Sequence, residues 1–277
     1  MALIDPVRTT LAGRLRSLVG SGSVDLSRPP GDDGLFGPAS PAWRVHGDFS
    51  AMMIGGISAL LLQMLHPLAL AGVWDHSNFR ADRLRRLRGT ARFIAATTFG
   101  STATAEAAIA QVRAIHDRVH GTLPDGTRYD ANDPALLTWV HIAEVDSFLR
   151  AYLRYRDPGM TGRDQDRYLA DAALVAERLG AADVPRSRAA VVDYYARVRP
   201  ELRFDHRTRE VAEALLAPGE DRAVNAGMQL AARAAADLLP EWAARMHGRA
   251  PSNLARPAIR AGAGAMSGMV RWALKRR

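Results

Sequence analysis

The 277-residue chain contains no cysteine. This absence excludes disulfide bonds, iron–sulfur clusters, thiolate ligation of heme iron and cysteine nucleophiles. Aromatic residues make up only 6% of the chain, and no sustained alternation of polar and apolar residues is present, which disfavours a β-sheet fold. Alanine, leucine and arginine, which favour helices, are abundant instead. We therefore expect an all-α single domain of about eight to ten helices.

Lysine is also scarce. The chain has 37 basic residues and a formal net charge of +8, and Lys275 is its single lysine. An arginine excess can indicate nucleic-acid binding, but the arginines here alternate with Asp and Glu, and no basic array contains spaced aromatic residues. We expect no nucleic-acid partner. Residues 1–20 contain Asp5 and lack a long apolar segment, which argues against a secretory signal and predicts a cytoplasmic location.

Composition divides the chain into an N-terminal extension and loop at 1–42, a helical domain at 43–248 and a basic amphipathic tail at 249–277. Residues 1–20 predict a short basic helix, and residues 21–41, rich in Gly, Pro, Ser and Asp, predict an exposed loop. The tail predicts a helix that either packs on the protein or contacts a membrane surface.

The stretch from Phe49 to Trp74 contains no Asp, Glu, Lys or Arg, and its length would suffice for a membrane-spanning helix. Pro67 lacks an amide donor and should end or kink the helix. Gln63 and His66 also interrupt the apolar run. These interruptions favour the buried central helix of a globular protein over a membrane span.

Apolar spacing and terminal signals predict further helices from residue 81 onward and at 102–121, 134–155, 161–179, 186–198, 207–216, 223–239 and 256–277. Gly121 is placed as the C-cap of the helix over 102–121, and the stretch TLPDGTRYDANDP that follows predicts a loop.

In AAIAQVRAIHDRVHG, residues 107–121, Ile109, Val112, His116 and Val119 recur at helical spacing. This pattern puts the imidazole of His116 in an apolar stripe, where it needs a hydrogen-bond partner or a metal. A hydrogen-bonded core histidine and a metal or heme ligand both remain open on spacing alone. His120 lies four residues later, so the two could chelate one metal ion, although spacing fixes no third ligand.

Other catalytic patterns are absent from the sequence. It contains no HExxH, no HxH and no Glu-x-x-His pair of the ferritin-like type, no G-x-S-x-G elbow, and no Rossmann or P-loop glycine pattern. These absences weaken the zinc-hydrolase, serine-hydrolase and nucleotide-binding interpretations. His66 and His141 also lie on or beside segments that the pattern marks as buried.

Several segments together resemble the DUF2236 family, which includes the fungal MpaB oxygenase and the latex-clearing rubber oxygenases. They are LLQMLHPLALAGVWDHSNF, RLRGT and VRAIHDRVHGTLPDGTRYDANDPALLTWVHIAEVDSFL, and the resemblance extends over residues 43–245. The ordered run QxxHP, HS, RxxxT, H and DPxxxxWVH is fairly specific. The resemblance implies an all-helical domain with a globin-like core, one heme b held by a single proximal histidine, and dioxygen chemistry on apolar, often isoprenoid, substrates.

Carried over to this sequence, the resemblance implies that His116 is the proximal iron ligand and the metal-binding residue. It makes Arg86 and Thr90 the RxxxT pair on the distal side, and hence the candidate catalytic residues. The guanidinium could pair with a heme propionate or an oxygen-derived anion, and the threonine could donate to dioxygen. His120 is the rival ligand. His66 and His141 match further positions of the cofactor site, where we expect structural or supporting roles.

Two departures from the rubber oxygenases are visible. Those enzymes have a lysine immediately before the threonine, where this chain has Gly89, and a catalytic glutamate on the preceding helix, where Phe49–Trp74 has no acid. We therefore do not expect cleavage of polyisoprene. We expect a heme b-dependent oxygenase acting with dioxygen on an apolar small molecule. The alternatives are a non-enzymatic heme or hydrophobic-ligand binding protein, and a non-heme metal protein using His116 and His120.

Overall fold

A computed structural model describes residues 31–77, 79, 83–217 and 222–274, apart from the side chains of 83–87 and 222–224. This part of the chain forms twelve α-helices, one short 3-10 helix and a two-stranded hairpin. In chain order they are α2 (Pro41–His46), α3 (Phe49–Gln63), α4 (Pro67–His76), α5 (Arg83–Phe99), α6 (Thr102–His116), β1 (His120–Thr122), β2 (Arg128–Asp130), α7 (Pro134–Tyr155), α8 (Gly162–Leu179), α9 (Arg188–Val198), η1 (Arg199–Glu201), α10 (His206–Leu216), α11 (Arg222–Leu238), α12 (Glu241–Met246) and α13 (Ala255–Leu274). The predicted all-α single domain is confirmed. The helix predicted at 1–20 lies outside the described residues.

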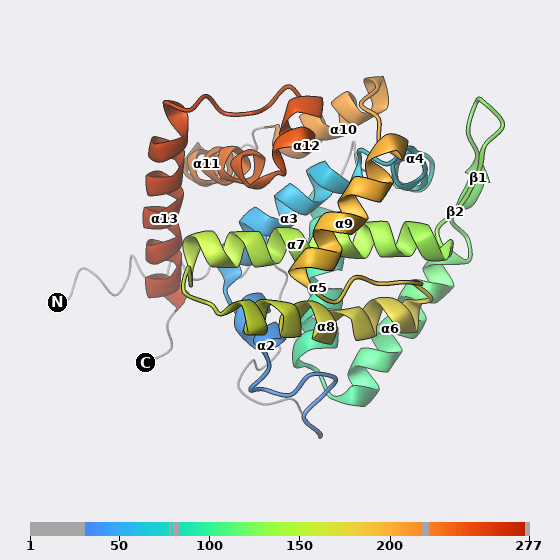
Figure 1. Ribbon diagram of the computed structural model, residues 1–277, viewed down its shortest axis with the longest axis horizontal. Helices are drawn as coiled ribbons and strands as arrows, with labels where there is room; N and C mark the ends of the chain where they lie inside the picture. The colour runs from blue at the N-terminus through green and yellow to red at the C-terminus, as the bar shows by residue number, and fades with distance from the viewer. Residues whose placement is uncertain (1–30, 78, 80–82, 218–221, 275–277) are drawn as a thin grey trace.

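The core is built on α3 and α7, which pack against each other along their lengths (Figure 1). Gly55 allows this close approach, because a Cβ atom there would lie 2.9 Å from the carbonyl oxygen of Ser147 and 3.0 Å from Cα of Phe148. Asp133 begins α7 by accepting hydrogen bonds from the first backbone amides of the helix. Trp139 and Ile142 of α7 are almost completely buried in the resulting core.

Pro67 divides the long apolar run into two helices, as predicted. α3 ends at Gln63, α4 begins at Pro67, and the two helix axes are bent by 105°. Most residues of α3 are buried within the protein. Within the described ranges no single helix is long and apolar enough to cross a membrane, and α3 with α4 meets the length and composition test only as a bent pair.

α5 and α6 form a helical hairpin that packs against α2 and α8. The turn between them requires Gly100, because a Cβ atom there would lie 2.5 Å from the carbonyl oxygen of Ala96 and 2.9 Å from Cγ2 of Thr104. Ser101 then caps α6 with its side chain, as predicted. α5 therefore reverses sharply into α6, so the start of α5 and the end of α6 both belong to the open end of the hairpin, opposite the turn.

The sequence prediction for the end of α6 was wrong. The helix ends at His116 rather than at Gly121, and the predicted loop contains the β1–β2 hairpin, in which Gly121 pairs with Tyr129. A long-range contact accounts for the difference: the Tyr129 hydroxyl donates to Asp75 Oδ2 of α4 at 2.6 Å. Gly121 fits against the tyrosine ring, where a Cβ atom would lie 2.6 Å from the hydroxyl oxygen.

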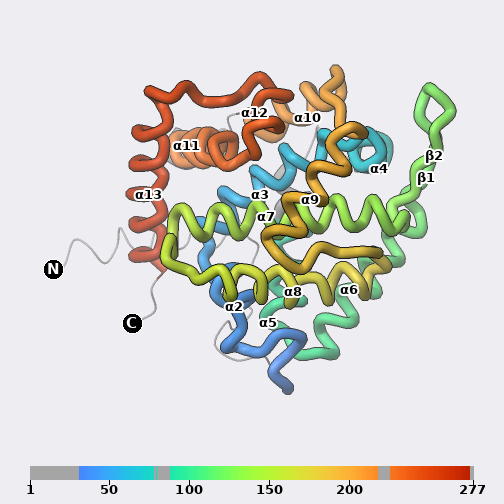
Figure 2. The backbone as a smooth tube through the Cα atoms, in the orientation of Figure 1, coloured from blue at the N-terminus to red at the C-terminus, as the bar shows by residue number. Residues whose placement is uncertain are grey.

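The C-terminal helices cover one end of the α3–α7 pair. α11 packs on α3, and α13 packs on α11 with further contacts to α3 and α7. In Figure 2 α13 forms one edge of the molecule, and the β1–β2 hairpin projects from the opposite edge.

Candidate functional site

The open end of the α5–α6 hairpin carries three of the predicted site residues. Arg86 and Thr90 belong to the first half of α5, and His116 is the last residue of α6. Thr90 and His116 are half-buried, whereas the side chain of Arg86 lies outside the described residues. The backbone therefore brings the predicted ligand and the RxxxT pair to the same end of one helical hairpin.

The chain around His116 is fixed from several directions. Its carbonyl accepts a hydrogen bond from the amide of Val119 at 2.8 Å, and Asp117, which follows it, accepts one from Asn132 Nδ2 at 2.7 Å. Val119 lies against α4, since a Cβ atom on Gly72 would be 3.3 Å from Val119 Cγ1. His116 is thus held at the junction of α6, the β-hairpin and α4.

His120 does not share a helix face with His116, contrary to the sequence prediction. Because α6 ends at His116, His120 becomes the first residue of β1, where its side chain is exposed. Its carbonyl oxygen lies 3.3 Å from Nε2 of His76. No group of three or more His, Asp or Glu side chains within the described part of the chain could hold a metal ion. The HxxxH spacing therefore does not form a chelating pair on one helix.

His66 lies at the N-terminus of α4. Its Nδ1 accepts a hydrogen bond from the amide of Leu68 at 3.3 Å, and its Nε2 lies 3.5 Å from the Glu201 carboxylate. The ring packs near Trp139, with 5.9 Å between centroids. Burial lowers the pKa of His66, and the Glu201 carboxylate opposes that shift. These contacts start α4 directly before Pro67.

His141 lies in the first half of α7 and is deep in the protein, although its ring keeps some accessible surface. Burial lowers its pKa to about 4, so the ring is neutral at neutral pH. Its Nε2 is buried and has no hydrogen-bond partner among the described residues. A buried polar nitrogen without a partner is costly, so this atom is a candidate for contact with a bound group.

His46, at the end of α2, was not singled out by the sequence. Its Nδ1 lies 2.7 Å from Oγ1 of Thr98, and its Nε2 lies 2.9 Å from the hydroxyl of Tyr168. Burial lowers its pKa to about 3, and the nearby His141 adds to the shift. The hydrogen-bonded chain links α5, α2 and α8. Its members are 52 and 122 residues apart, so no local sequence signal marks it.

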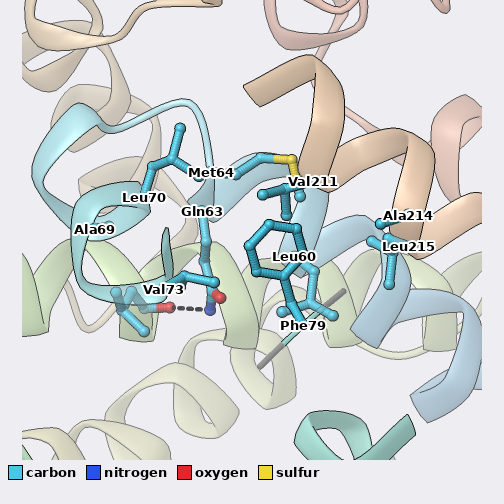
Figure 3. Close-up of a pocket in the computed structure, with 11 residues that line it drawn as sticks. Leu60, Gln63, Met64, Ala69, Leu70, Val73, Phe79, Val211, Ala214 and Leu215 are labelled. Atoms are coloured by element: carbon cyan, nitrogen blue, oxygen red, sulfur yellow. Dashed lines mark hydrogen bonds between the residues drawn. The ribbon is translucent and has the colours of Figure 1, made fainter. Parts of the chain in front are cut away.

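A small apolar pocket of about 70 Å³ lies between α3, α4, α7 and α10 (Figure 3). Its walls are apolar except for Gln63, whose amide already donates to the carbonyl of Val140 at 3.0 Å. Phe79 and Val211 both contribute side chains to its lining. Of the predicted site residues whose side chains are described, none lines this pocket; Val140 immediately precedes His141.

Residues 43–272 match the family model described as "ER-bound oxygenase mpaB/B'/Rubber oxygenase, catalytic domain". The match spans most of the chain and includes every predicted site residue. The chain belongs to this family. No curated protein and no solved structure matches it significantly. Membership in the mpaB/rubber oxygenase family confirms the resemblance carried by the QxxHP, RxxxT and DPxxxxWVH motifs and indicates an oxygenase domain.

Within this mpaB/rubber oxygenase domain, Gly89 occupies the position immediately before Thr90. It is exposed, and no heavy atom lies within 4 Å of the place that its Cβ atom would take. The absence of a side chain here is therefore not imposed by crowding.

Proposed function

We propose that this protein is a heme b-dependent oxygenase that uses dioxygen to oxidise an apolar small molecule, with His116 as the iron ligand. The observation that carries the proposal is the α5–α6 hairpin of this oxygenase-family domain. Its open end has His116 on one helix and the RxxxT pair, Arg86 and Thr90, on the other.

The residues near this end of the hairpin fit a heme group. Phe93 of α5 and Val112 of α6 are large apolar side chains that are only half-buried, as expected for a surface that a bound apolar group would cover. The buried, unpaired Nε2 of His141 offers a further nitrogen that could contact such a group. Histidine is also the ligand type available, since the chain has no cysteine.

When bound, heme b would supply a redox-active iron for dioxygen chemistry. His116 would hold the iron as a neutral imidazole, which adds no charge to an apolar surrounding. The Arg86 guanidinium would pair with a propionate or another anion, and the Thr90 hydroxyl would donate a hydrogen bond on the distal side. The apolar side chains of α5 would limit the access of water.

The pocket in Figure 3 supports an apolar substrate. The amide of Gln63, its one polar side chain, already donates a hydrogen bond to the carbonyl of Val140, so a polar ligand would find few partners there. We propose that part of the substrate enters this pocket, beside the α7 segment that carries His141.

A non-enzymatic heme-binding protein is the second candidate. Gly89 favours it, because the position has room for a side chain yet carries none next to Thr90. Dioxygen consumption by the purified protein with an isoprenoid or fatty substrate separates the two candidates. The oxygenase consumes dioxygen only when substrate is present, and the binding protein does not consume it.

The absorption spectrum of protein expressed with ample heme tests the ligand. We expect a Soret band in the wild type, its loss in His116→Ala and its retention in the matched variants His120→Ala and His141→Ala. Loss in His120→Ala or His141→Ala, with retention in His116→Ala, would transfer the ligand role to that histidine. A colourless wild type would overturn heme dependence.

Arg86→Ala tests the distal role. We expect this variant to keep its Soret band and to change the rate at which the ferrous protein autoxidises. An unchanged rate would remove Arg86 from the distal site.

A further inference from the structure

The charge of this chain is concentrated at its C-terminal end. Residues 242–277 contain eight basic residues and no Asp or Glu. Their formal charge of +8 equals the formal net charge of the whole protein. The preceding 241 residues are balanced, with 29 basic and 29 acidic side chains. Four of the eight basic residues pair with Glu241, Asp237 or Asp48, whereas three others, Lys275, Arg276 and Arg277, follow one another at the end of the sequence.

The arginines of α13 point toward the protein. Arg260 Nε lies 2.7 Å from Oδ2 of Asp237, and Arg271 Nη1 lies 3.3 Å from Oδ2 of Asp48. Arg256 Nε is 3.4 Å from Oδ1 of the same Asp237. Both aspartate side chains are almost fully buried. These ion pairs fix the rotation of α13, with its arginines on the inner and lateral sides.

The outward face of α13 is apolar. Met269 and Trp272 lie one turn apart and are 59% and 43% exposed, and Ala258, Ala261 and Ala265 are exposed along the same stripe. Positions on this stripe recur at steps of three and four residues. α13 is therefore apolar on two sides: Ala263, Val270 and Ala273 are buried against the protein, and the stripe with Met269 and Trp272 faces outward.

α13 also forms one edge of the molecule (Figure 1), and the other described residues leave the stripe with Met269 and Trp272 exposed there. Its 20 residues span about 30 Å. The sequence continues with Lys275, Arg276 and Arg277 directly after the exposed Trp272 turn. An apolar stripe with an exposed tryptophan and adjacent basic residues matches a bilayer surface that carries anionic headgroups.

We propose that the outward face of α13 docks the protein on the surface of an anionic lipid bilayer. Met269 and Trp272 enter the interfacial layer, and the three terminal basic residues pair with anionic headgroups. A second copy of the chain is a poorer occupant, because a symmetric α13–α13 contact would bring two strongly basic ends together. The proposal depends on α13 and the three basic residues that follow it in the sequence, and it is independent of heme.

Flotation of the full-length protein with phosphatidylcholine vesicles, with and without phosphatidylglycerol, tests the proposal. We expect binding to the anionic vesicles that falls with added salt, and little binding to the neutral ones. Lys275→Gln, Arg276→Gln and Arg277→Gln combined should weaken binding about 100-fold. Met269→Ser with Trp272→Ser should weaken it about tenfold or more.

Val192→Ser is the matched control, because Val192 is an apolar residue that is 61% exposed on α9, outside α13. It should leave vesicle binding unchanged, and circular dichroism should show native helix content in all variants. No binding by the wild type, or undiminished binding by the Met269 and Trp272 variant, would overturn the proposal. So would concentration-dependent dimerisation that this variant abolishes, since the face would then be a self-association surface.

Discussion

Acid should destabilise this protein through His46, and the size of the loss in the free energy of unfolding follows from the burial of its ring. The pKa of His46 is lowered to about 3 in the folded chain by burial, against 6.5 for an unperturbed histidine. Above about pH 6.5 the ring is neutral in both states and has no effect on the free energy of unfolding. Below that pH the unfolded chain binds a proton that the folded chain does not, so stability is lost as the pH falls toward the folded pKa.

At pH 5 the loss from His46 is about 2 kcal/mol, from about 1.4 kcal/mol for each pH unit below 6.5. His141, with a folded pKa of about 4, adds a similar loss. Together these losses are a large share of the roughly 5–15 kcal/mol that stabilises a typical domain. Burial also lowers the pKa values of His66 and His247, which add to the loss of stability in the same direction.

Urea denaturation of the wild type and of His46→Gln, at about pH 7.5 and about pH 5, measures the effect. Glutamine keeps a donor and an acceptor for Thr98 and Tyr168 but binds no proton. We expect the wild type to lose about 2 kcal/mol more than His46→Gln between the two pH values. His120→Gln, which removes an exposed imidazole, should follow the wild type. Equal losses in the wild type and in His46→Gln would refute the argument.

Two further substitutions test the packing. Gly55→Ala should destabilise the protein by about 1–3 kcal/mol in urea denaturation, because the new Cβ would meet the α7 backbone. Gly264→Ala is the control: no heavy atom lies within 4 Å of its Cβ position, so it should be neutral or stabilising. Equal effects of the two substitutions would contradict the close approach of α3 and α7. Asp237→Asn should lower the free energy of unfolding by about 2–3 kcal/mol and increase proteolysis around α13, because it weakens the pairs with Arg154, Arg256 and Arg260. Unchanged proteolysis would show that apolar packing alone holds α13.

Capping residues, prolines and glycines in the sequence correctly predicted the ends of the helices that depend on neighbouring residues alone. Asp133 and Pro134 mark the start of α7, and Thr161 and Gly180 bound α8, where Gly180 adopts the left-handed conformation. The end of α6 could not be predicted in this way. Gly121 reads as a C-cap, but the contact between Tyr129 and Asp75 draws the chain into a hairpin five residues earlier.

The orientation of α13 also depends on contacts with residues that are distant in the sequence. Its sequence shows an amphipathic pattern, which by itself predicts that the apolar side faces the protein. One apolar side, with Ala263, Val270 and Ala273, does face the protein, and the buried aspartates at positions 48 and 237 fix the helix further by pairing with its arginines. Those partners lie far away in the sequence, so the pattern alone does not show which face is turned outward.

In the candidate site, too, sequence motifs predicted some residues, whereas features that depend on the folded structure were not predicted. Motif resemblance predicted Arg86, Thr90 and His116, and the structure assigns these residues, 26 to 30 positions apart, to the same end of the α5–α6 hairpin. The sequence motifs did not predict that burial would keep His46 and His141 neutral near each other. The burial that keeps these imidazoles uncharged, and leaves His141 with an unpaired nitrogen, also makes the fold sensitive to acid. A group bound at Nε2 of His141 would satisfy that nitrogen and oppose its protonation. Because the folded chain would then take up no proton at His141 even below about pH 4, bound heme should steepen the acid loss of stability in the wild type more than in His141→Ala.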